Sequence, residues 1–106
     1  MDPECRNISR LILPAIRASV AEIMKQEYNY RQKEIAERLG VVQVSVSKYL
    51  NRRYSAEIEK LKKEIMEKGM SIKIVEDIVK GRSSEEIGKE IDSLCGSIAE
   101  SMPAKA

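Results

Sequence analysis

Four side chains between positions 43 and 48 have the chemistry needed to contact the edges of nucleic-acid bases. They are an amide, an aliphatic group, a hydroxyl and an ammonium, carried by Gln43, Val44, Ser47 and Lys48. Residues three and four positions apart share a helix face, so a helix here would present all four together. Such groups can hydrogen-bond to base edges or, for the valine methyls, contact a thymine methyl. The segment is therefore a candidate surface for reading bases.

A helix-turn-helix would position this surface, and the flanking residues fit one. Ile35, Ala36 and Leu39 place apolar atoms on one face of a first helix, and the small Ala36 allows a second helix to cross closely. Gly40 suits the tight turn because glycine adopts a left-handed backbone at little cost, and Val41 can fill the corner. Three apolar residues then return to the shared core from a second helix: Val46, Tyr49 and Leu50.

The charge pattern favours a polyanionic partner for the same segment. No acidic residue lies between Glu37 and Glu57, but the interval carries four basic ones: Arg38, Lys48, Arg52 and Arg53. Through Tyr54 the chain has ten Lys or Arg against six Asp or Glu, and after it nine against eleven. The basic excess therefore coincides with the motif, where DNA could approach without repulsion.

The run LGVVQVSVSKYL resembles the helix-turn-helix of the Cro and lambda-repressor-like superfamily. With the preceding segment LILPAIRASVAEIM, the chain is also similar to a group of archaeal predicted transcriptional regulators. Some members of that group carry this unit fused to a thiamine-pathway phosphate-binding domain. The present sequence continues into no such domain, and we predict no thiamine role for it.

The resemblance implies a role for each candidate residue. Gln43, Val44, Ser47 and Lys48 would face the major groove, where they would contact bases. Four others would contact phosphates: Gln32 at the start of the first motif helix, and Asn51, Arg52 and Arg53 after the second. Val42 occupies the predicted cap position of the second helix, where Ser or Thr is commoner, so about 1 kcal/mol of capping free energy is expected to be missing.

The apolar pattern predicts an all-α fold of five to six helices in a single domain, residues 1–106. Residues 1–54 would hold an N-terminal helix and the helix-turn-helix, and residues 55–106 the C-terminal helices. In the first segment, residues 2–28, Pro14 predicts a short helix, a kink near Leu13 and a longer helix. Asn29 is expected to cap the next helix, with Gln32 completing a capping box.

Three further helices are predicted after the motif. Ser55 would begin one that runs to Lys68, with its charged residues, Lys62 among them, on a solvated face. Ser71 would begin a shorter one to Lys80, although its β-branched residues also allow a strand. Ser83 and Glu86 form a capping box for the last helix.

The last helix carries an apolar seam: Ile87, Ile91, Leu94, Ile98 and Met102. This seam could pack on the domain's own core or pair with a second copy. A homodimer is the favoured state, because helix-turn-helix repressors commonly bind two half-sites. The sequence does not choose which helices form the interface.

Composition argues against several other classes of protein. The chain has no histidine, which removes the commonest general base and metal ligand, and it has no glycine-rich phosphate loop. Cys5 and Cys95 lack a pairing or metal-binding pattern and are interpreted as buried free thiols, with a redox switch as the alternative. No apolar run has the ~18 residues of a membrane span, and no secretory signal is recognised, so a cytoplasmic location is expected.

The sequence thus predicts a non-enzymatic DNA-binding transcriptional regulator, a repressor, that binds double-stranded DNA as a homodimer. No cofactor or metal is expected, and no small-molecule effector can be named. The alternative is an interaction adaptor, in which the same helical module binds a protein partner and no DNA.

Overall fold

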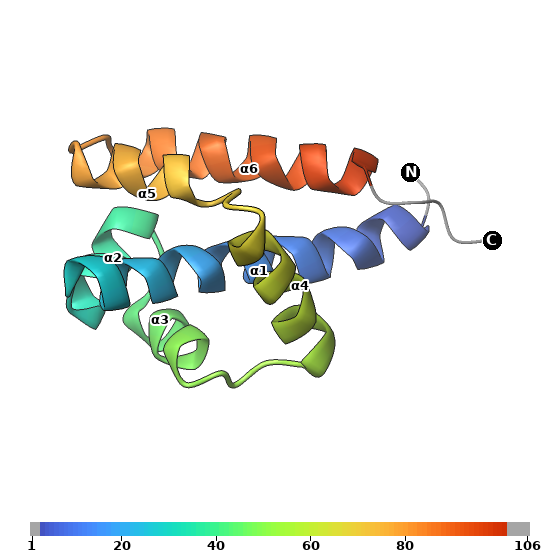
Figure 1. Cartoon of the computed structure of the whole chain (residues 1–106), viewed down its shortest axis with the longest axis horizontal. Coiled ribbons are helices and arrows are strands. Elements are labelled where there is room, and N and C mark those ends of the chain that lie inside the picture. Colours follow the sequence, from blue (N-terminus) through green and yellow to red (C-terminus); the bar gives the residue numbers. More distant parts are fainter. Residues whose placement is uncertain (1–2, 102–106) are drawn as a thin grey trace.

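The computed structural model describes residues 3–101, with side chains described from Arg10 onward, and this part of the chain is entirely helical. Its six helices confirm the predicted fold class. They are α1 (Pro3–Tyr28), α2 (Gln32–Leu39), α3 (Gln43–Leu50), α4 (Ala56–Glu67), α5 (Ile72–Val79) and α6 (Ser84–Ser101). Figure 1 shows α1 through the middle of the molecule, with α5 and α6 along one side and α3 on the other.

The central helix α1 is one unbroken helix that contains Pro14. Pro14 therefore does not divide this segment into the short and the longer helix that were predicted. A proline inside a helix removes one hydrogen bond and crowds the preceding turn. Here the residues on both sides of it, Ile12, Ala15 and Ile16, are fully buried. Their packing outweighs the local cost, because each buried aliphatic side chain contributes about 1.5 to 3 kcal/mol.

The end of α1 differs from the prediction at Asn29. Its φ angle is 57°, a left-handed conformation that asparagine tolerates better than most residues. The Asn29 N–H donates to the Lys25 carbonyl oxygen at 3.2 Å, and the Tyr30 N–H donates to that of Met24 at 3.1 Å. Asn29 therefore ends α1 and does not cap α2, and the predicted box with Gln32 is wrong. In its place, Glu34 accepts the Arg31 N–H at 3.1 Å.

The signals at the start of the later helices are largely confirmed. Ser55 accepts the Ile58 N–H at 3.3 Å, and Ser83 accepts that of Glu86 at 3.2 Å. Residues 72–79 are helical, which excludes the strand alternative. Ser71 precedes this helix but forms no capping hydrogen bond, because its hydroxyl instead contacts that of Ser19 in the interior.

A single aliphatic core joins all six helices. From the C-terminal seam, Ile87, Ile91 and Ile98 are buried in this core, and Leu94 packs against it half-buried. The seam therefore packs on the protein's own core and is not available to pair with a second copy. Met102, the last seam residue, lies outside the described residues.

Candidate nucleic-acid interface

The turn between α2 and α3 has the geometry that the sequence predicts. Gly40 has a φ angle of 69°, in the left-handed region. Its N–H donates to the Glu37 carbonyl oxygen at 3.3 Å, and the Val41 N–H donates to that of Ala36 at 3.0 Å. These bonds close the end of α2, and α3 begins three residues after Gly40, at Gln43. A side chain at Gly40 would strain the turn, which explains the glycine there.

The inner faces of both helices hold the motif rigidly against α1. Ile35, Ala36, Leu39 and Val46 are buried, while Tyr49 and Leu50 pack against the same core half-buried. All six residues were predicted to lie inward. Because α3 is anchored through three of its eight positions, the direction of its outward side chains is determined by packing.

The outward face of α3 holds the predicted base-contacting residues. Gln43, Val44 and Lys48 are exposed, and Val44 is 65% accessible. Val42 beside them is 68% accessible and forms no capping hydrogen bond, as predicted. Exposed aliphatic groups cost free energy in water, so two neighbouring valines at the start of a helix are suited to an apolar contact such as thymine methyls.

Ser47 differs from its neighbours on this face. It is half-buried, and the Asn51 amide donates to its carbonyl oxygen at 2.9 Å and to its hydroxyl oxygen at 3.2 Å. Asn51 thereby binds the last turn of α3. The structure thus connects a predicted base-contacting residue with a predicted phosphate-contacting residue.

The remaining phosphate candidates have different surroundings. Gln32 begins α2 and is half-buried. Arg53 is exposed and forms no ion pair with any side chain from residue 10 to residue 101. Arg52 has a φ angle of 56°, and its guanidinium lies 3.6 Å from the Glu22 carboxylate on α1.

Arg38, counted among the basic residues of the motif, has an internal role. It is half-buried, donates to the Ile78 carbonyl oxygen at 3.0 Å and lies 5.8 Å from the centre of the Tyr30 ring. The cation binds the end of α5, where a positive charge is favourable. The cations of the acid-free interval that remain directed to solvent are Lys48, Arg52 and Arg53.

Lys62 was predicted to lie on a solvated face, and this prediction is wrong. Only 2% of its side chain is accessible. Its ammonium lies 3.1 Å from Glu22 and 3.1 Å from Glu59, and 5.8 Å from the centre of the Tyr54 ring. The aromatic ring and two carboxylates compensate the buried charge of the Lys62 ammonium. The sequence pattern of α4 does not reveal these partners, so it could not predict that Lys62 is buried.

Burial and hydrogen bonding shift the pKa values of Tyr54, Glu59 and Lys62 in this cluster. Burial and the hydrogen bond to Glu59 raise the pKa of the Tyr54 hydroxyl, and that same bond lowers the pKa of Glu59. Burial by itself would lower the pKa of Lys62, but hydrogen bonding to Tyr54, Glu22 and Glu59 raises it. These contacts therefore favour the charged form of Lys62.

A second ionic cluster joins α5 to α6, on the other side of α1 from α3. Lys73 lies 3.0 Å from the buried Asp77 and 3.7 Å from Glu90. Hydrogen bonding to Lys73 lowers the pKa of Asp77, while burial and the neighbouring Asp77 carboxylate raise the pKa of Glu90.

The two cysteines differ in what can be said of them. Cys95 is a half-buried free thiol whose pKa is raised by burial and by the nearby Asp92. The Cys5 side chain lies outside the described part of the chain. Among the described residues no cluster of acidic or cysteine side chains could hold a metal ion, and no helix is both long and apolar enough to cross a membrane.

Helices α2 and α3 and the turn between them form a helix-turn-helix. Residues 20–63, from the middle of α1 into α4, match the helix-turn-helix family model, which supports the resemblance of this segment to the Cro and lambda-repressor-like superfamily. The superfamily is one of DNA-binding regulators and is not typically enzymatic. Neither the curated proteins nor the solved structures contain a match to the chain.

Proposed function

We propose that this protein is a sequence-specific transcriptional repressor that reads the major groove with α3. The observation that carries the proposal is the outward face of α3. It combines exposed Gln43, Val44 and Lys48 on a helix fixed by buried Val46, within an acid-free stretch of the chain. A rigid helix bearing hydrogen-bonding and methyl groups is what direct readout of base pairs requires.

The proposed base contacts follow from side-chain chemistry. Gln43 can pair with adenine through two hydrogen bonds, and Lys48 can donate to the acceptors of guanine. Val44 would contact a thymine methyl. Ser47 can accept or donate, but its hydrogen bond to Asn51 limits its freedom, so its contribution is expected to be smaller.

The proposed phosphate contacts position α3 without reading sequence. Gln32 lies at the start of α2, where backbone N–H groups also favour an anion. Arg52 and Arg53 lie directly after α3 and would bind the backbone beside the groove. Asn51 shares this end of the helix, and its present hydrogen bonds support the local backbone.

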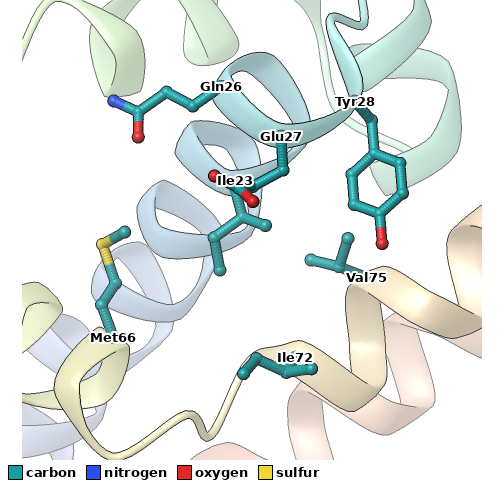
Figure 2. A pocket seen from close by; sticks show the side chains of 7 residues that line it. All are labelled: Ile23, Gln26, Glu27, Tyr28, Met66, Ile72 and Val75. Atoms are coloured by element: carbon teal, nitrogen blue, oxygen red, sulfur yellow. The ribbon is translucent and has the colours of Figure 1, made fainter.

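We further propose that the active form is a homodimer, with α5 at the interface. Ile72 and Val79 at opposite ends of α5 are 52% and 41% accessible. An antiparallel pairing of α5 with the α5 of a second copy would bring Ile72 of one chain beside Val79 of the other. The adjoining groove has a volume of about 500 Å³. In Figure 2 the Tyr28 side chain of α1 points toward Val75 of α5. These two exposed side chains and the groove beside them are the observations that support this interface.

Repression in this proposal is steric, because a dimer bound across a promoter blocks polymerase. Two copies related by a twofold axis would read a roughly palindromic operator with half-site centres ~34 Å apart or a multiple of that distance. The test is selection of bound duplexes from a random library, followed by footprinting. Recovery of a repeated half-site with this spacing supports the proposal. Recovery of unrelated sequences, or of no duplex, overturns it and favours a protein partner for the module.

A further inference from the structure

Arg52 and Lys62 both form an ion pair with the same carboxylate oxygen of Glu22 on α1. The Oε1 atom of Glu22 lies 3.6 Å from the Arg52 guanidinium and 3.1 Å from the Lys62 ammonium. Arg52 is 61% accessible, whereas Lys62 is almost fully buried. One carboxylate on α1 therefore connects a surface cation beside the DNA-binding face to a buried cation on α4.

The buried part of this network does not depend on Arg52. Lys62 also lies 3.1 Å from Glu59, and Glu59 accepts a 2.7 Å hydrogen bond from the Tyr54 hydroxyl. Glu22 is largely buried, with 15% of its side chain accessible, so its charge needs a permanent partner. Lys62 supplies that partner whether or not Arg52 is in place.

We propose that Arg52 transfers from Glu22 to a DNA phosphate on binding, and that Lys62 is the positioning residue that makes this transfer possible. The inference rests on the proposed DNA-binding function. The Arg52 side of this ion pair is exposed and the 3.6 Å separation is long, so the pair is weak and a phosphate can displace Glu22 as the partner of Arg52. Lys62 then continues to compensate the negative charge of Glu22. Arg53, by contrast, is exposed and needs no release.

Two variants separate this role from a purely structural one, because both break the same ion pair between Glu22 and Lys62. Glu22→Gln frees Arg52 while Lys62 keeps Glu59, so affinity for duplex DNA is expected to rise about two- to fivefold. Lys62→Met leaves Glu22 with Arg52 as its cation, so affinity is expected to fall and the salt slope to become shallower. A purely structural role predicts changes in the same direction.

The deciding experiment is a double-mutant cycle measured by fluorescence anisotropy on a selected duplex and a scrambled one, at two salt concentrations. It compares wild type, Glu22→Gln, Arg52→Ala and the double variant, with thermal melts to verify folding. Glu57→Gln is the matched control, since Glu57 is an exposed carboxylate near Arg52 in sequence and forms no ion pair within the described chain. The gain from Glu22→Gln is expected to vanish in the Arg52→Ala background.

Each contrary result has a distinct meaning. An equal gain in the Arg52→Ala background, or from Glu57→Gln, would show that removal of any nearby negative charge suffices. That result, or the absence of a gain, overturns the transfer of Arg52 while the proposed function stands. Absence of salt-dependent binding by the wild-type protein overturns the proposed function itself, and this inference with it.

Discussion

The Arg38 guanidinium donates a 3.0 Å hydrogen bond to the carbonyl oxygen of Ile78, and so joins α2 of the helix-turn-helix to the end of α5. The contact spans forty positions in sequence. The same guanidinium lies over the Tyr30 ring. Because both contacts are inside the protein, Arg38 is not among the cations expected to bind DNA. Arg38 therefore connects the DNA-binding motif to the helices that follow it.

This relationship predicts a separation of stability from DNA binding. Replacing Arg38 with Met is expected to destabilise the fold by about 1.5 to 3 kcal/mol, because a hydrogen bond from a charged group is lost at a partly buried site. The salt slope of DNA binding should not change. Urea unfolding and affinity at several salt concentrations measure the two effects, and a slope reduced by about one would instead assign Arg38 to a phosphate.

The outward residues of α3 and the arginines after it should respond differently to substitution. Gln43→Ala or Lys48→Ala is expected to relax preference at particular base pairs by about 1 to 3 kcal/mol. Arg53→Ala should weaken binding to all sequences alike and reduce the salt slope by about 1. Affinities for single-base variants of the selected site test this division, which equal losses on operator and random DNA from all three changes would contradict.

The uncapped start of α3 offers a stabilising substitution. Val42 has the extended backbone of a capping residue, with φ −76° and ψ 151°, but no side-chain hydrogen bond. Val42→Ser is expected to add about 1 kcal/mol to the free energy of unfolding, since its hydroxyl can accept a free N–H of the first turn. Val42→Ala removes the same exposed methyl groups without providing a cap. Equal stability of the two variants in urea would show that no cap forms.

The Asp77 and Glu90 pair predicts a pH effect of known sign. The pKa of Glu90 is raised on folding, so its favourable contribution is present below its unfolded value of 4.5 and is lost as pH rises through the folded value. Glu90→Gln should therefore stabilise the protein relative to wild type at neutral pH, and the difference should shrink toward pH 4. Glu85→Gln, an exposed change on the same helix, should show no such trend. A Glu90→Gln variant that is less stable at neutral pH would contradict the assignment.

The proposed α5 interface predicts a change in oligomeric state. Ile72→Glu is expected to shift a dimer toward monomer in sedimentation experiments, because a charge would be buried where two apolar side chains meet. Ser93→Glu, an exposed change on α6, is the matched control. A wild-type monomer at micromolar concentration, or an Ile72→Glu dimer, would exclude this interface.

Local signals explain why much of the fold could be predicted from the sequence. Gly40 determines the turn through its own backbone freedom, and Ser55 and Ser83 act within three residues of their partners. The inward positions of α2 and α3 follow from helical periodicity alone. These features depend on neighbours in sequence, so one sequence suffices to find them.

Tertiary partners explain what could not be predicted. The apolar stripe of α6 predicts that Ile91 is buried. It does not show whether the protein's own core or a second copy of the chain covers this side chain. Lys62 and its neighbour Lys63 look alike in the sequence, yet only Lys62 meets a carboxylate from α1. At Asn29 the two possible roles, ending one helix or starting the next, differ only in backbone conformation, which the flanking helices decide.

The central claim is that α3 reads base sequence, and its most direct test is the affinity of the wild-type protein for the best selected duplex relative to a scrambled duplex, at two salt concentrations. The proposed function predicts a preference of about 10³ or more and a steep loss of affinity with salt on both duplexes. Weak binding without preference, or no binding to either duplex, would contradict it.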